Sequence, residues 1–246
     1  MKKNILVIVG LLFFNVFQLL GQGEKFETSL GYSFSIASGW RIIPQEVSDA
    51  RRAEIKKTFN VDIPNFDVAL QLASAKDWYE RPYIIITRKD IGKLSDGDIR
   101  ETMKSFDSLF VKIKEDMILS SKGLLIMEKI SKKSFDEKNK ILYLIFPGHA
   151  EGFGSIINYQ VWMLTNKGYI QFVASSLAAD FETFFPDFDF FIQHFEIKED
   201  LKYQDSHDVE NAIDWYKLSI RISSILIVIM LVYFGKKGLR WYTNRK

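Results

Sequence analysis

The side chains best suited by type and spacing to do chemistry lie in a glycine-rich stretch at residues 147–154. His149 and Glu151 stand two residues apart there, and such a loop can present ligands to a metal or N–H groups to an anion. No Gly-Lys-Ser/Thr sequence follows, so a flexible hairpin is the favoured interpretation. His194 and Glu196 repeat the spacing at the end of an apolar helical pattern, where histidine commonly caps the last carbonyl groups.

Nucleophilic chemistry has little support in the sequence. Gly154-Ser155 lacks the glycine two residues after the serine that a nucleophile elbow needs. Cysteine is absent, which excludes thiolate metal sites and cysteine nucleophiles. We therefore assign no catalytic, cofactor-binding or metal-binding residue and expect no cofactor. A hydrolase with a site around His149 and Glu151 is kept as an alternative.

Two surface features could contact a partner instead. Trp78 and Tyr79 lie in a charged loop, Lys76-Asp-Trp-Tyr-Glu-Arg-Pro82, which is a poor place to hide an indole. Aromatic rings in loops usually fold back onto the core, so partner contact is the less common of the two readings. Five lysines surround a hairpin tip and could meet anionic lipid or an acidic partner, although a solvated hairpin end is the default. They are Lys129, Lys132, Lys133, Lys138 and Lys140.

The elements that position these residues are bounded by two apolar stretches. Residues 215–235 are long enough for a helix across a hydrocarbon core of about 30 Å, and 222–234 contain no charge. Aromatic residues flank this stretch and a basic cluster follows it, as is typical of a membrane span. Near the start, two lysines precede an apolar run and a small residue, the layout of a secretory signal peptide.

These stretches predict five parts. They are a signal peptide at 1–22, an extracytoplasmic domain at 23–197, an acidic stalk at 198–214, a transmembrane helix at 215–235 and a basic cytoplasmic tail at 236–246. The positive-inside rule places the tail in the cytoplasm and the domain outside. The lack of cysteine and of glycosylation sequons, with the lysine-rich composition, favours a bacterial inner (cytoplasmic) membrane.

Charge is divided unevenly along the chain. All 31 acidic residues and 24 of the 33 basic residues lie between Glu24 and Asp214, which gives this region a formal charge of −7. Phosphate neutralisation needs a basic face, so we expect no nucleic-acid partner.

The hydropathy pattern of the outer region predicts one α+β domain. Residues 32–36 and 40–43 read as a strand pair turned at Ser38-Gly39, and 47–59 read as a helix. Residues 66–72 and 83–86 read as neighbouring strands. Ser95 and Asp98 supply capping side chains for an amphipathic helix that runs to about residue 117.

The second half of the region predicts a strand meander and a final helix. The strands cover 124–132, 141–146, 155–165 and 169–175, and their short connections imply antiparallel pairing. A phenylalanine-rich helix follows, in which Pro186 is tolerated if it falls in the first turn. Its large apolar groups are expected to be core, because exposed they would form an association-prone patch.

Two short motifs resemble a known family. Gly31-Tyr-Ser-Phe-Ser-Ile-Ala-Ser-Gly-Trp40 is similar to the opening hairpin of the PsbP-like fold, and Phe191-Ile-Gln-His-Phe195-Glu-Ile is similar to its closing motif. The resemblance covers about residues 24–197. Ala37 replaces a common proline and His194 a common serine. The resemblance implies an antiparallel sheet packed against helices, and a non-enzymatic, partner-binding scaffold.

The sequence therefore predicts a membrane-anchored, extracytoplasmic binding or assembly module without catalytic activity. Its partners are expected to be the lipid bilayer and an envelope protein or complex. The alternatives are the hydrolase described above and a sensor that signals through the single span.

Overall fold

The computed structural model describes residues 23–59, 65–95, 97–105, 111, 114, 125–150, 152 and 154–204. The predicted signal peptide, transmembrane helix and basic tail, and most of the acidic stalk, lie outside these residues. Within them, no helix combines the length and the apolar character needed to cross a bilayer.

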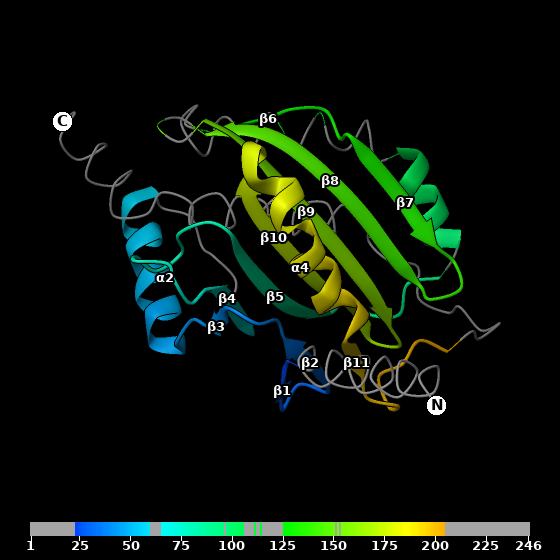
Figure 1. Cartoon of the computed structure of the whole chain (residues 1–246). Coiled ribbons are helices and arrows are strands. Elements are labelled where there is room, and N and C mark those ends of the chain that lie inside the picture. Colours follow the sequence, from blue (N-terminus) through cyan, green and yellow to red (C-terminus); the bar gives the residue numbers. More distant parts are fainter. Residues whose placement is uncertain are drawn as a thin grey trace, which may run out of the picture.

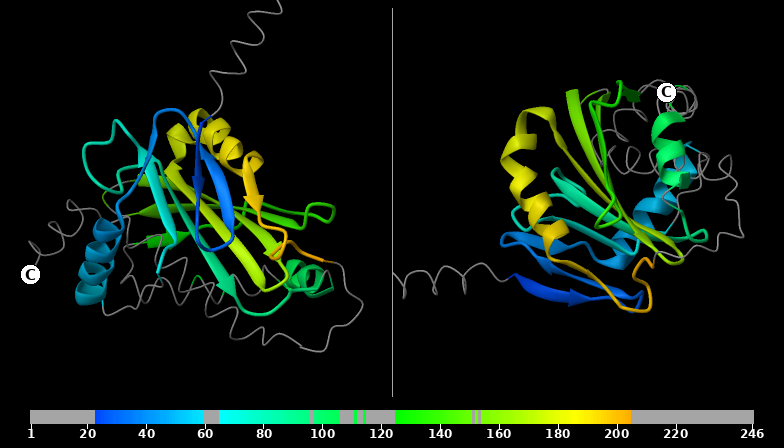
Figure 2. Two further views of the ribbon diagram at one scale, coloured as in Figure 1. Left: turned by 90° about the horizontal axis from the view of Figure 1, so that it is seen from below. Right: turned by 90° about the vertical axis from the view of Figure 1, so that its right-hand side faces the viewer.

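The described residues form a three-stranded and an eight-stranded antiparallel sheet with helices on both faces of the larger one (Figures 1 and 2). The strands are β1 (Glu24–Glu27), β2 (Tyr32–Ile36), β3 (Trp40–Ile42), β4 (Val68–Leu72), β5 (Tyr83–Asp90), β6 (Leu125–Met127), β7 (Lys132–Asp136), β8 (Ile141–Ala150), β9 (Gly154–Thr165), β10 (Gly168–Leu177) and β11 (Phe195–Ile197). The helices are α2 (Gln45–Phe59), a turn of 3-10 helix η1 (Ala178–Asp180) and α4 (Phe181–Gln193), and residues 97–105 are also helical.

The large sheet has the order β3-β4-β5-β10-β9-β8-β6, and β7 also pairs with β8. Its central strands are buried on both faces. On β5, Tyr83 and Ile85 belong to the core on one face, whereas Ile84 and Ile86 belong to the core on the other. Because both faces are covered, this strand reads as a continuous apolar run rather than an alternating one.

The helices cover opposite faces of this sheet, as the right-hand view of Figure 2 shows. Helix α4 lies on one face, while α2 and residues 97–105 lie on the other. The predicted cap of the second helix is confirmed: Asp98 N donates to Ser95 Oγ at 3.1 Å and Ser95 N donates to Asp98 Oδ2 at 3.0 Å. The predicted meander is confirmed by β8, β9 and β10, which pair antiparallel in sequence order.

The predicted pairing of residues 32–36 with 40–43 is wrong. Strand β2 pairs with β1 and β11 in the small sheet, whereas β3 pairs with β4 in the large one. The turn closed by Trp40 N and Ala37 O therefore carries the chain from one sheet to the other. The Trp40 ring lies 5.5 Å from Phe191, and its Nε1 donates to Asp187 Oδ2 at 2.9 Å, so α4 fixes the start of β3.

The strand predicted at 124–132 is divided into β6 and β7. Met127 pairs with Gly148 and Lys132 pairs with Ile145, so residues 128–131 bulge opposite two residues of β8. Pro147, which has no N–H, lies in the strand opposite this bulge. Strand β8 continues to Ala150 instead of ending at residue 146, because residues 147–150 pair with residues 154–157 of β9.

The final helix differs from the prediction in one respect. Pro186 is the sixth residue of α4 and lies inside the helix rather than in its first turn. It removes one backbone donor, which leaves the carbonyl of Glu182 without its usual helical partner. The expected burial of the apolar face is confirmed for Phe181, Phe188, Phe191 and Ile192, whereas Phe184, Phe185 and Phe195 are half-buried against the same core.

Candidate functional site

The expected glycine-rich loop is mostly strand. His149 lies in β8, is exposed, and pairs with Ser155 on one side and Ile126 on the other. Glu151 lies outside the described residues, so the hydrolase alternative stays a prediction. No group of three or more His, Asp or Glu side chains suited to a metal occurs among the residues that the structure describes.

The second histidine and carboxylate pair is occupied by local contacts. His194 caps α4, with both its backbone N and its ring Nδ1 within 3.0 Å of the Phe190 carbonyl oxygen. Glu196 accepts a hydrogen bond from Lys25 Nζ at 2.7 Å. This bond lowers the pKa of Glu196 and raises that of Lys25. The two side chains therefore do not converge on a common ligand.

Two of the five lysines around the predicted hairpin tip contact neighbouring segments, and the other three are exposed. Lys133 Nζ donates to the Met103 carbonyl oxygen at 3.1 Å, and Lys140 Nζ lies 5.3 Å from the centre of the Tyr203 ring. Lys129, Lys132 and Lys138 are exposed. These contacts attach the β7–β8 hairpin to neighbouring segments.

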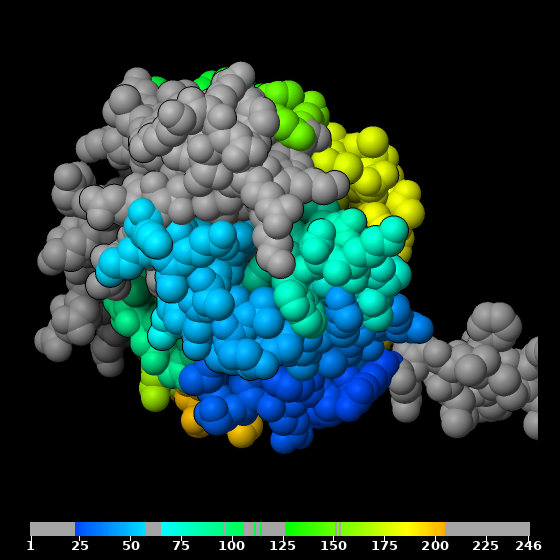
Figure 3. All heavy atoms as spheres, turned by 90° about the vertical axis from the view of Figure 1, so that its left-hand side faces the viewer, coloured from blue at the N-terminus to red at the C-terminus, as the bar shows by residue number. Residues whose placement is uncertain are grey.

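The connection between β4 and β5, residues 73–82, carries an exposed tryptophan. We call it the Trp78 loop. It extends away from the strands (Figure 2, left), and its turquoise surface stands beside the blue surface of α2 (Figure 3). Trp78 is 39% exposed, whereas Tyr79 is 4% exposed. Of the two predicted contact residues, only Trp78 therefore presents its ring at the surface, and partner contact through it stays a prediction.

Two polar side chains hold the backbone of this loop. Gln71, at the end of β4 and fully buried, accepts from Tyr79 N at 2.7 Å and donates from Nε2 to the Asp77 carbonyl oxygen at 3.2 Å. Glu80 Oε2 accepts from Lys76 N at 2.7 Å. The loop is thus fixed from inside by buried and local hydrogen bonds.

Tyr79 anchors the loop to the core. Its hydroxyl donates to Ser48 Oγ of α2 at 2.7 Å, and its ring meets Tyr83 edge-on with 5.9 Å between centroids. Burial raises the pKa of Tyr79 to about 12, so the phenol stays protonated. Its φ of 62° is unusual for a residue with a bulky side chain, and such conformations cost about 1–3 kcal/mol. The chain holds this strained backbone where it turns Trp78 outward.

Arg41 of β3 supports the exposed indole. Its guanidinium carbon lies 4.5 Å from the centre of the Trp78 ring, and its Nη2 donates to the Ala75 carbonyl oxygen at 2.9 Å. A guanidinium stacked on an indole is a favourable cation–π pair. Arg41 and Trp78 are thus in contact, and both belong to the residue types that are enriched at interface hot spots.

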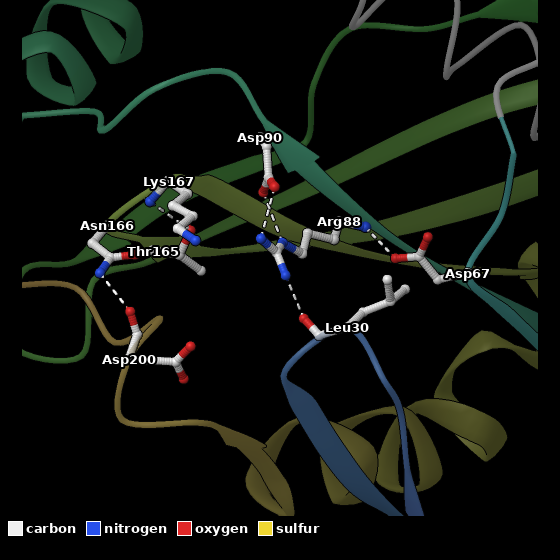
Figure 4. Close-up of polar contacts among 8 residues, drawn as sticks. All are labelled: Leu30, Asp67, Arg88, Asp90, Thr165, Asn166, Lys167 and Asp200. Carbon is white, nitrogen blue, oxygen red and sulfur yellow. Dashed lines mark hydrogen bonds and ion pairs between the residues drawn. The ribbon is translucent and has the colours of Figure 1, made fainter.

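A second polar cluster, at the far end of the sheet, is structural (Figure 4). Arg88 donates from Nε and Nη2 to the Asp90 carboxylate, both at 2.7 Å, and from Nη1 to the Leu30 carbonyl oxygen at 2.5 Å. Its backbone N donates to Asp67 Oδ2. Burial raises the pKa of Asp67 in spite of this bond. The cluster fastens the turn of the small sheet to β5.

A row of buried polar groups crosses the face of the large sheet that α2 covers. Asn158 and Ser175 are opposite each other on β9 and β10, and Ser175 is opposite Tyr83. Both amide atoms of Asn158 find no hydrogen-bond partner among the described residues, whereas the Ser175 hydroxyl lies against the Tyr83 side chain. Both side chains are at most 1% exposed, so they form no open site.

Comparisons with known proteins give a likeness of fold. No protein-family model matches the chain, and no curated protein matches its sequence. The solution structure of cyanobacterial PsbP (CyanoP) from Synechocystis sp. PCC 6803 is similar, with a TM-score of 0.49 and 14% sequence identity over 72% of this chain and 93% of that one. The expected antiparallel sheet packed against helices is confirmed by the structure itself, and the PsbP-like fold stays a resemblance. It identifies no activity, partner or site residue.

Gln71 of β4 and Arg41 of β3 support the Trp78 loop, and the sequence analysis did not identify either of them. Gln71 reads as the polar side of an alternating strand, although it is fully buried. One signal could have drawn attention to it, namely a glutamine in a strand whose neighbours on both sides are apolar. Arg41 carries no comparable signal, because its contact with Trp78 joins segments 37 positions apart.

Proposed function

We propose that this chain is a binding or assembly module without catalytic activity, which uses the Trp78 loop to contact a protein of the cell envelope. The loop presents one large aromatic side chain on a backbone that is already held in place. Binding through such a surface loses little conformational entropy, because the loop does not need to become ordered.

The observation that carries this proposal is the internal support of an exposed tryptophan. If the Trp78 indole had no partner to contact, it could pack against the core without reducing solubility. Here the buried Gln71, the strained Tyr79 backbone and the Arg41 stack all hold Trp78 in an outward position. Local strain and buried polar groups cost stability, and they are found where a fixed geometry is used.

We also propose that the domain works at the outer surface of a bacterial cytoplasmic membrane. The basis is the sequence: an apolar stretch at 215–235, the basic cluster after it and the leader-like start. Protease added to intact spheroplasts should then digest the domain, and salt alone should leave the full-length chain in the membrane fraction.

The test is crosslinking and co-purification of the intact chain from membranes, with Trp78→Ala beside the wild type. A specific companion should be recovered with the wild type and reduced at least ten-fold with Trp78→Ala. Leu30→Ala is the matched control, since Leu30 is also a large apolar residue with 36% exposure and its carbonyl contact to Arg88 survives the change. Equal recovery with all three chains would refute the proposed contact.

A further inference from the structure

Arg41 has an unusual electrostatic position for an arginine near the surface. Its Nη2 bonds a neutral carbonyl oxygen and its carbon atom Cζ lies over an uncharged ring. Its Nε is buried and finds no acceptor among the described residues. The ion pairs between described residues do not include Arg41. A guanidinium has five N–H donors arranged to meet a carboxylate in bidentate fashion, so much of its hydrogen-bonding capacity is unused here.

The nearby carboxylates are committed elsewhere, with one exception. Glu80 accepts from the backbone of its own loop, and Asp49 and Glu54 of α2 pair with Arg52 and Arg51 at 2.7 and 2.6 Å. Asp77 is exposed beside Trp78. Its carbonyl oxygen accepts from Gln71 Nε2, and its carboxylate has no contact with Arg41 among the described residues.

The indole next to Arg41 offers a different kind of contact. Arg41 occupies part of the Trp78 ring, and 39% of the residue remains exposed to solvent. An apolar or aromatic side chain of a partner would bury this surface, and burial of a tryptophan is among the largest single contributions to protein association.

We propose that the Trp78 loop binds an acidic, apolar peptide segment, in which a carboxylate pairs with Arg41 and an adjacent apolar side chain packs on Trp78. This inference rests on the proposed function and specifies its partner. A carboxylate can accept from the guanidinium N–H groups of Arg41 other than the buried Nε, which a partner cannot reach, and the adjacent indole offers an apolar surface to the neighbouring side chain. Lysine, a point charge without the planar fork, serves the site less well.

The experiment uses the intact chain in lipid nanodiscs and a random heptapeptide library displayed on phage. Selection against the wild type, with counter-selection against Trp78→Ala, should enrich peptides that carry Asp or Glu next to an aromatic or aliphatic residue. Synthetic forms of these peptides should bind Arg41→Gln about ten-fold more weakly, and Arg41→Lys should fall in between. Replacing the peptide carboxylate with its amide should cause a similar loss in the wild type and little further loss in Arg41→Gln.

The control is Arg100→Gln, which removes an exposed arginine on the helical segment 97–105 and should leave binding unchanged. Circular dichroism of every variant verifies that the fold is retained. Trp78-dependent peptides without acidic residues, or with equal affinity for Arg41→Gln, overturn the acidic partner and leave the proposed function standing. If no enriched peptide depends on Trp78, the contact surface itself is refuted and this inference fails with it.

Discussion

Replacing Gln71 with leucine should expose how the Trp78 loop is held. Leucine fills a similar space but can neither accept from Tyr79 N nor donate to the Asp77 carbonyl oxygen. Leaving the buried Tyr79 N–H unpaired costs about 1–3 kcal/mol, and the second bond contributes about 1 kcal/mol more. The expected loss is therefore about 2–4 kcal/mol of unfolding free energy, with the first effect in the loop.

Two assays of the intact chain measure this effect. Urea-dependent proteolysis gives the change in unfolding free energy, and hydrogen exchange with mass spectrometry follows the amide of Tyr79. We expect lower urea resistance for Gln71→Leu and faster exchange in residues 73–82 than in β9 or β10. The wild type should protect the Tyr79 amide, because it is both buried and hydrogen-bonded.

Asn158→Leu is the matched control. Asn158 is 1% exposed and on the same face of the sheet, yet its amide atoms have no hydrogen-bond partner among the described residues. Leucine at this position should raise stability by about 1 kcal/mol, since an unpaired buried amide is removed. We expect only Gln71→Leu to lose unfolding free energy. Equal losses for both variants, or no loss for Gln71→Leu, would show that the hydrogen bonds of the Gln71 amide do not hold the Trp78 loop.

Three further variants test the framework around the site. Asp67→Asn should raise the thermal midpoint more at pH 7 than at pH 3. Burial raises the pKa of Asp67 in the folded state, so the protonated group favours the fold below its unfolded pKa. That contribution is lost as pH rises through the folded pKa, and asparagine does not ionise. A midpoint shift that is equal at the two pH values would contradict the raised pKa. Trp40→Phe loses the bond to Asp187 and should reduce unfolding free energy by about 1–2 kcal/mol in urea titrations, whereas an unchanged transition would show that α4 does not depend on it. Gly168→Ala should be the most damaging, by more than about 3 kcal/mol. An added Cβ would lie 2.0 Å from the Lys89 carbonyl oxygen, and a soluble, normally stable variant would show that this turn is not constrained as described.

The parts of the fold that depend on local patterns could be predicted from the sequence. Alternation and a short Asn-Lys-Gly turn locate β9 and β10, and Ser95 with Asp98 marks the helix that follows β5. Partner choice could not be predicted in the same way. The turn before Trp40 looks like a hairpin, but the side chain of Trp40 packs under α4, which comes about 140 residues later.

The missed strand β1 has a similar cause. Glu24–Glu27 contains a single apolar side chain, and only its pairing with β2 makes it a strand, with Phe26 opposite Phe34. For the site, the unusual setting of Trp78 could be recognised because composition alone makes an indole among charges improbable. Its support could not, because Gln71 and Arg41 act through contacts that exist only once β3, β4 and the loop are assembled.

Photocrosslinking in living cells from position 78 measures whether the Trp78 loop contacts a partner. With p-benzoylphenylalanine in place of Trp78, we expect one discrete crosslinked protein in the membrane fraction. The same probe in place of Leu30, which has nearly the same exposure, should give none. No adduct from position 78, or identical adducts from both positions, would contradict the assignment of the Trp78 loop as the contact surface.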